Sequence, residues 1–227
     1  MATQLDLQEQ EQLDALKSFW KKYGNLITWV LILVLGAFAA WNGWNYRQRD
    51  QATKASAMYG ALEQAAQAGD AERVGRVFAD LKQAYPKTAY AQQGGLAAAR
   101  TQFGAGQTDA AQASLQWVAD NAVETEYRTI ARLRLAALLA SAKKYDEALK
   151  QLDGATATGF EALVADRRGD VLSAAGRNDE ARSAYQAAWK AMDDKVEYRR
   201  LIDAKLTALG AAPAAASPGA AASGGAS

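Results

Sequence analysis

An apolar stretch near the N-terminus constrains this chain most strongly. Residues 26–44 read LITWVLILVLGAFAAWNGW, 19 residues without a charged side chain. At about 1.5 Å per residue, a helix of this length covers roughly 28 Å, close to the hydrocarbon thickness of a bilayer. A helix satisfies its own backbone hydrogen bonds, so it can cross lipid without leaving polar groups unpaired. The stretch therefore predicts a single transmembrane helix over residues 26–44, with the lipid bilayer as its surroundings.

The residues around this stretch agree with a membrane span. Basic residues close the run on both sides, and aromatic rings stand where the membrane–water interfaces would lie: Trp20, Tyr23, Trp41, Trp44 and Tyr46. Two other interpretations are a buried helix of a soluble domain and a signal peptide cleaved at the small residues of Ala37-Phe38-Ala39. A buried helix rarely needs so long an uncharged run. A signal peptide normally begins with a short basic segment, whereas here about 25 residues with several carboxylates come first.

Residues 1–25 predict a short amphipathic leader helix that precedes the span. Its apolar side chains can share one helical face: Leu5, Leu13, Leu16, Trp20 and Tyr23. The leader could lie on the membrane, contact a partner or simply be solvated. Lys and Arg are nearly balanced across the span, so the orientation does not follow from charge alone.

Composition narrows the class of function. The 227 residues carry a net charge of +1 and contain no Cys and no His. A net charge so close to zero gives no field that would attract nucleic acid. Without Cys and His the chain lacks thiolate chemistry, the commonest metal ligand and the commonest general base, although a Ser–Lys pair stays open. We therefore expect no enzyme, no cofactor, no metal site and no nucleic-acid partner.

The chain after the span predicts an all-α domain over residues 45–209. Good helix formers dominate, and no sustained alternation of β-branched and aromatic residues indicates strands. Turn signals recur every 33 to 37 residues between helical patterns, at Gly69-Asp70, Gly104–Gly106, Lys143-Lys144 and Gly176–Asn178. This punctuation predicts a series of helical hairpins. Residues 190–209 predict a capping helix, and the Ala/Gly/Ser/Pro segment at 210–227 predicts a disordered tail.

Two of the hairpins match each other closely. Superimposing Tyr145–Ala148 on residues 178–181 gives a spacing of 33 and aligns Ala136 with Gly169. Small residues at these places let paired helices approach closely, as in the 34-residue tetratricopeptide pattern. Two upstream units fit less well, with spacings of 37. The sequence thus favours a degenerate tetratricopeptide-like solenoid over the alternative of an unrelated helical bundle.

A solenoid of this kind uses the first helix of each pair to line a concave face. The positions that we expect to face outward there form the candidate protein-binding set: Tyr59, Glu63, Arg100, Phe103, Asp166 and Asp170. An exposed aromatic ring beside a charge is a plausible peptide contact. Tyr59 and Phe103 could instead belong to the core. As a carboxylate pair, Asp166 and Asp170 are interpreted as a solvated helix face rather than a chemical site.

The chain also resembles a known family. The acidic leader, the single anchor, the degenerate repeats and three stretches carry the resemblance: YPKTAYA at 85–91, Tyr145–Leu149 and GDVLSAAGRNDEARSAY. These features are similar to those of the YfgM family, the ancillary SecYEG translocon subunits of Gram-negative bacteria. The resemblance implies a single-pass inner-membrane protein with a cytoplasmic N-terminus and periplasmic repeats. It also implies contact with SecYEG, with a PpiD-like membrane-anchored chaperone and with newly translocated, unfolded proteins, and it brings no catalytic motif.

Two hypotheses of function follow. One is a membrane-anchored chaperone and interaction module at the Sec translocon. The other is a scaffold that organises another cell-envelope or cytochrome-assembly complex without contacting unfolded proteins.

Overall fold

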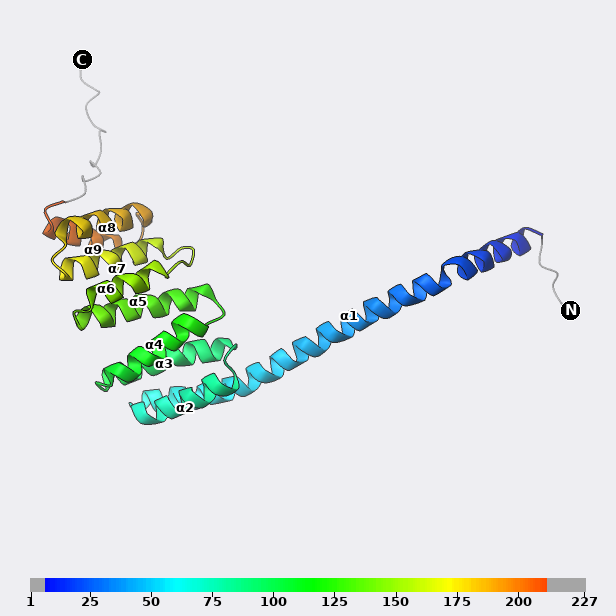
Figure 1. The fold of residues 1–227 in the computed structure, drawn as a ribbon, viewed down its shortest axis with the longest axis horizontal. Helices are drawn as coiled ribbons and strands as arrows, with labels where there is room; N and C mark the ends of the chain where they lie inside the picture. Colours follow the sequence, from blue (N-terminus) through cyan, green and yellow to red (C-terminus); the bar gives the residue numbers. More distant parts are fainter. Residues whose placement is uncertain (1–6, 212–227) are drawn as a thin grey trace, which may run out of the picture. The chain divides into compact units, whose positions relative to one another are not determined.

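The computed structural model describes residues 7–211, and its regular elements in that range are helices only (Figure 1). The predicted all-α class is confirmed. The chain divides into two units, residues 1–51 and residues 52–227, with the division inside the first helix. The helices are α1 (Leu7–Gln67), α2 (Ala71–Ala84), α3 (Ala89–Gly104), α4 (Thr108–Asn121), α5 (Thr125–Ser141), α6 (Tyr145–Asp153), α7 (Glu161–Ala174), α8 (Asn178–Ala191) and α9 (Arg199–Ala208).

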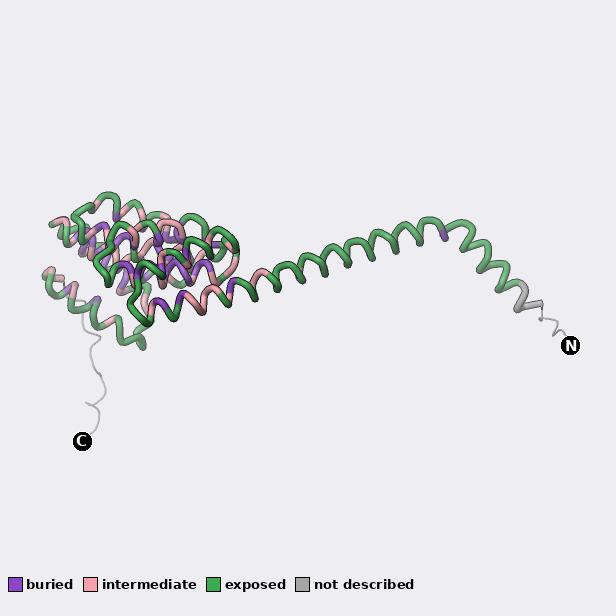
Figure 2. Tube along the Cα trace, turned by 90° about the horizontal axis from the view of Figure 1, so that it is seen from below, coloured by how far each residue is buried: buried purple, intermediate pink, exposed green. Residues whose placement is uncertain are grey.

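The N-terminal unit consists of the first part of α1. The leader from Leu7 onward and the apolar stretch form one unbroken helix, while residues 1–6, including Leu5, lie outside the described part. Most residues of the stretch are exposed, and the tube of Figure 2 is green along most of it; Leu33 is 72% and Trp41 69% exposed. The helix is long and apolar enough to cross a membrane. Lipid would take these side chains out of water.

The second unit stacks four helical hairpins, made by the end of α1 with α2, α3 with α4, α5 with α6, and α7 with α8 (Figure 1). Its core is a series of four clusters rather than one centre. Each cluster draws its side chains from a hairpin and the helix that follows; Leu62 and Phe78 lie in the first, and Tyr185 and Ile202 in the last. A hairpin alone cannot cover its apolar face, so each one depends on its neighbour.

Small residues set the distance between paired helices. Ala136, Ala148 and Ala181 are fully buried, as the repeat pattern predicts. A side chain at Gly169 would collide with the ring of Tyr185 on α8. Two adjacent glycines, Gly94 and Gly95, allow a similarly close approach. In the structure they lie in α3, where a Cβ would meet Leu81 at Gly94 and Val118 and Phe78 at Gly95.

The turns between paired helices share one geometry. After each first helix a residue with positive φ ends the helix: Gly69, Gly106, Lys143 and Gly176. The next N–H then bonds a carbonyl five residues back, as Gln107 does to Gln102 and Arg177 to Leu172. This is the Schellman arrangement that glycine favours at helix ends. Lys143 adopts it at φ 61° although it carries a side chain.

The end of the domain differs from the sequence-based prediction. The prediction of a single helix over residues 190–209 is wrong, because α8 ends at Ala191 and α9 begins only at Arg199. Asp193 explains the break: its Oδ1 accepts a hydrogen bond from the Lys195 N–H at 2.9 Å. Asp side chains compete in this way with the helical hydrogen bonds and favour turns. The predicted tail lies outside the described residues from residue 212 on.

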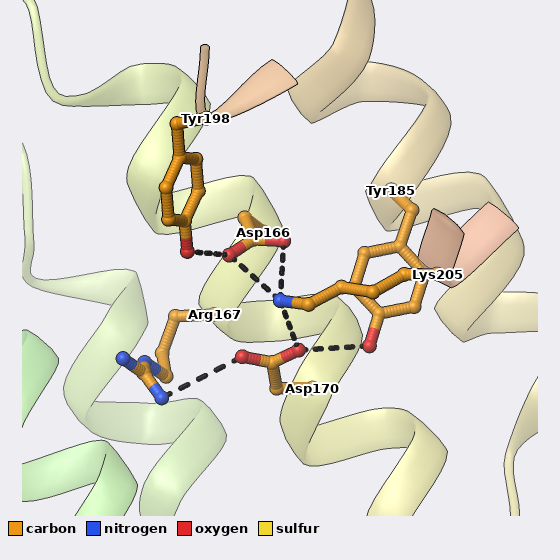
Figure 3. A network of polar contacts seen from close by, with 6 residues as sticks. All are labelled: Asp166, Arg167, Asp170, Tyr185, Tyr198 and Lys205. Carbon is orange, nitrogen blue, oxygen red and sulfur yellow. Dashed lines mark hydrogen bonds and ion pairs between the residues drawn. The ribbon is translucent and has the colours of Figure 1, made fainter. Parts of the chain in front are cut away.

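The cap helix α9 is tied to the last hairpin by a buried charge network (Figure 3). Lys205 Nζ lies 2.8 and 3.0 Å from the two carboxylate oxygens of Asp166 and 2.6 Å from Asp170 Oδ1. The Tyr198 hydroxyl donates to Asp166 at 2.8 Å, and the Tyr185 hydroxyl donates to Asp170 at 2.9 Å. The network thus joins α7, α8 and α9.

The expected outward position of Asp166 is therefore wrong, and so is its interpretation as part of a solvated face. Its side chain is buried, with the residue only 2% exposed, because α9 brings Lys205 and Tyr198 over it. Burial first, and the bond to Asp166 second, raise the pKa of the Tyr198 phenol to about 12. Burial likewise raises the pKa of Tyr185. A tyrosine phenol is already protonated at neutral pH, and the raised pKa values keep both phenols able to donate in more alkaline solution as well.

The positive φ at Lys143 makes a stability prediction. Lys143→Gly should raise the free energy of unfolding by about 0.5–1 kcal/mol, because a side chain in the left-handed region costs roughly 1–2 kcal/mol. Gly176→Ala should lower it by about 1–2 kcal/mol for the same reason. As a control, Lys150→Gly in the middle of α6 should lower stability by about 1 kcal/mol. Urea denaturation of the full chain in detergent measures all three, and equal effects at Lys143 and Lys150 would contradict the explanation.

The cap network makes a second prediction. Lys205→Met leaves the buried Asp166 carboxylate without its cation and should cost about 3 kcal/mol of local stability. The loss should appear as faster hydrogen exchange in α9 and α8, since nearest-neighbour packing confines the damage to the end of the array. Lys190→Met, at an exposed position of α8, should change exchange little. Unchanged exchange in Lys205→Met would show that the network does not hold the cap.

Candidate protein-binding groove

The first helices of the pairs bring four of the six predicted residues together. Tyr59 and Glu63 come from the end of α1, and Arg100 and Phe103 from α3. They line two adjoining hollows on the second unit, one between α1 and α3 and one between α3 and α5. Asp166 and Asp170 belong instead to the cap network. We call the two hollows together the groove.

The hollow between α1 and α3 has a volume of about 840 Å³ and many polar side chains, so we call it the polar hollow. Its walls include Tyr59, Glu63, Gln93 and Thr101. Tyr59 is half-buried, with its ring 5.8 Å from that of Tyr90. Burial, followed by a hydrogen bond with Glu63, raises the pKa of the Tyr59 phenol. The expectation that Tyr59 faces a surface is thus compatible with partial packing against its own fold.

The hollow between α3 and α5 has a volume of about 360 Å³ and mainly apolar walls, so we call it the apolar hollow. Leu133, Ala137 and Leu138 of α5 form one side, and Phe103 of α3 stands at the other. Phe103 is 54% exposed, so it is not a core residue. An exposed ring beside an apolar hollow is the kind of surface at which a partner's side chain can be buried.

Two arginines belong to both hollows. Arg100 of α3 and Arg134 of α5 line the polar and the apolar hollow alike. Both are exposed, and within the described part of the chain neither forms an ion pair. Arg134 Nη1 donates only a long bond, 3.4 Å, to the Leu96 carbonyl. Burial first, and repulsion from Arg100 second, lower the pKa of the Arg134 guanidinium, which nevertheless stays charged.

Sequence reasoning missed several groove residues. Arg134 was one of them, although Arg167 lies 33 residues later, which is the spacing of the two best-matched repeats. Both arginines line the apolar hollow, so the repeat spacing was a signal that could have found them. Arg167 differs in having a partner, Asp170, at 3.5 Å. Gln93, which lines the polar hollow, was also missed. It donates a 2.8 Å hydrogen bond to the Tyr127 hydroxyl, and no sequence motif marks it.

The chemistry of the groove is that of binding. Its polar groups are guanidinium, carboxylate, amide and phenol groups on rigid helices, set beside an apolar hollow. Among residues 7–211 no group of three or more His, Cys, Asp or Glu side chains is placed to hold a metal ion. Such a surface can pair charges and bury apolar side chains of another polypeptide.

Comparison with known proteins agrees with this architecture. The family model described as a tetratricopeptide repeat-like domain matches residues 17–211. A relative in Neisseria gonorrhoeae named ancillary SecYEG translocon subunit is 32% identical over 204 residues, which cover 89% of this chain and 98% of the relative. A protein of the same name in Escherichia coli is 31% identical over 182 residues, covering 80% of this chain and 87% of the relative.

The matches cover most of the length of both relatives, and the family model spans the apolar stretch as well as the hairpins. It confirms the tetratricopeptide-like fold and the resemblance drawn from the sequence. The chain belongs to the YfgM family of ancillary SecYEG translocon subunits.

Proposed function

We propose that this protein is a membrane-anchored interaction module of the Sec translocon that assists newly translocated proteins through its repeat domain. The names of its relatives support the association with SecYEG. The observation that supports the rest is the groove. Within residues 7–211 its two arginines form no ion pair, and the exposed Phe103 lies beside an apolar hollow, on a domain that follows an apolar helix. Its role is non-catalytic binding of polypeptide.

The proposed arrangement places the N-terminus in the cytoplasm of a Gram-negative bacterium, α1 across the inner membrane and the hairpins in the periplasm. There the groove would meet polypeptides as they leave the channel, beside a PpiD-like membrane-anchored chaperone. Anchoring raises the effective concentration of the groove near the channel, so weak contacts suffice. A groove that binds weakly also releases its polypeptide, which then folds.

The membrane topology of the full chain is the first test of this proposal. In intact spheroplasts, an external protease should digest residues 52–211 of the full chain, because the proposal puts the hairpins outside the cytoplasm. Lysis should add no further digestion of this region. A cytoplasmic protein measured in the same samples serves as the control for leakage. Protection of the hairpins until lysis would reverse the proposed orientation and favour a scaffold on the cytoplasmic side.

The groove is the second test. Arg100→Glu combined with Phe103→Ala should reduce photocrosslinking of the full chain to a translocating polypeptide about fivefold or more, since both residues line the apolar hollow. The helical melting curve should not move, because both side chains are exposed. Arg76→Glu, at an exposed position of α2, is the matched charge control and should crosslink normally.

Two outcomes would contradict this part of the proposal. Crosslinking that survives the double change would move the contact away from the groove. A protein that binds SecYEG but neither crosslinks to translocating polypeptides nor reduces aggregation of a denatured protein would be a scaffold.

A further inference from the structure

The groove presents a positive site between two cavities of different character. Arg100 and Arg134 stand where the polar and apolar hollows adjoin, since they line both. Neither has a carboxylate partner within the described residues, whereas Arg167 nearby is paired with Asp170. Arg134 sits close enough to Arg100 for repulsion between the two guanidinium groups to contribute to lowering its pKa. An anion between the two guanidinium groups would relieve this repulsion and form charge-assisted hydrogen bonds.

We propose that Arg100 and Arg134 form a subsite for an acidic side chain of an extended polypeptide, whose neighbouring large apolar side chain enters the apolar hollow. This inference rests on the proposed function, because it names the class of segment that the groove would take. Arg is suited to the role, since its planar guanidinium can bind a carboxylate through two parallel hydrogen bonds.

The two hollows indicate an internal acidic residue rather than a chain end. A terminal carboxylate at the arginines would leave one hollow empty, whereas a segment that runs through the groove occupies both. In extended chain, side chains two residues apart point the same way and lie about 7 Å apart. An acidic residue and an apolar residue two positions away can therefore reach the arginines and the apolar hollow together.

The far end of the groove adds a restriction. Glu63 lines the polar hollow, so a second acidic side chain there would be repelled, while a basic or neutral polar one would be accepted. The preferred order along the segment is thus polar or basic, then acidic, then apolar. The chain's own residues 212–227 do not fit this description, because they contain only Ala, Gly, Pro and Ser.

Fluorescence anisotropy with the full chain in lipid nanodiscs tests the subsite. The probe is a labelled, amidated Gly/Ser peptide with Glu two positions before Phe. Three matched peptides carry Gln for Glu, Ser for Phe, or Glu and Phe with a free C-terminal carboxylate. We expect the Glu–Phe peptide to bind about tenfold more tightly than the Gln peptide, with the difference shrinking in high salt. Loss of Phe should also weaken binding.

Variants locate the effect. Arg100→Gln with Arg134→Gln should bind the Glu and Gln peptides equally, while Arg76→Gln on α2 should keep the preference. Arg100→Glu with Arg134→Glu should prefer a Lys peptide to the Glu peptide, because the site then carries only negative charge. Circular dichroism melting should stay unchanged, because both arginines are exposed. This reversal of preference separates a contact with the peptide from a loss of structure.

Three results would overturn the inference: equal binding of the Glu and Gln peptides to the unchanged protein, a preference that survives the double variant, or a large gain from the free C-terminal carboxylate, which would indicate a chain-end site. In each case, crosslinking to translocating polypeptides decides the larger question. If the unchanged protein still crosslinks to translocating polypeptides, the proposed function is supported and only the subsite is contradicted. If it does not crosslink, both the subsite and the proposed function are contradicted.

Discussion

The close approach of paired helices is the constraint on which the rest of this domain depends. At Gly169 the absence of a side chain lets the Tyr185 ring lie against the α7 backbone, and at Gly95 Val118 and Phe78 fill the same kind of space. Because these contacts bury one side of each first helix, another side is left to solvent. The groove follows from this geometry, since Arg100 and Phe103 can only be exposed where α3 is not packed. A larger residue at the small positions would separate the helices and move the walls of the groove.

A stacked array also has to end, and this one ends with charges rather than with apolar side chains alone. In a partly buried site, the Lys205 ammonium pairs with the carboxylates of Asp166 and Asp170. Two tyrosine hydroxyls donate hydrogen bonds to the same carboxylates. A buried ion network adds little net stability compared with an apolar contact of similar shape, but it tolerates few alternative arrangements. Apolar contacts through Ile202 and Leu206 supply the burial, and the network fixes where α9 sits. The cap thereby keeps the last hairpin from offering an apolar surface to other chains.

The sequence predicted what local patterns determine. The alignment of Ala136 with Gly169 placed the helix contacts, and the turn signals placed the helix ends, because both depend on residues close in the chain. Asp166 was misplaced because its partner, Lys205, lies 39 residues away on a helix whose start the sequence also misjudged. Asp166 and Asp170 lie four residues apart on α7, yet spacing along one helix says nothing of what covers that helix. In the same way, the role proposed for Arg134 depends on Arg100 of another helix. Only the packed hairpins show that these two residues lie side by side.

A groove with these properties suits a transient encounter. Its arginines are exposed, so a carboxylate bound there keeps contact with water and gains less than in a buried pair. The apolar hollow is small, and burying one side chain in it contributes about 2 kcal/mol. Neither the carboxylate contact nor the apolar contact alone binds a polypeptide tightly enough in free solution. Anchoring the domain to a membrane would raise its effective concentration near the channel. Selectivity then comes from requiring both terms at once, since the two arginines stand beside the apolar hollow on rigid helices. In the proposed function, the apolar span and the groove are therefore parts of one mechanism, in which the anchor makes weak and reversible recognition sufficient.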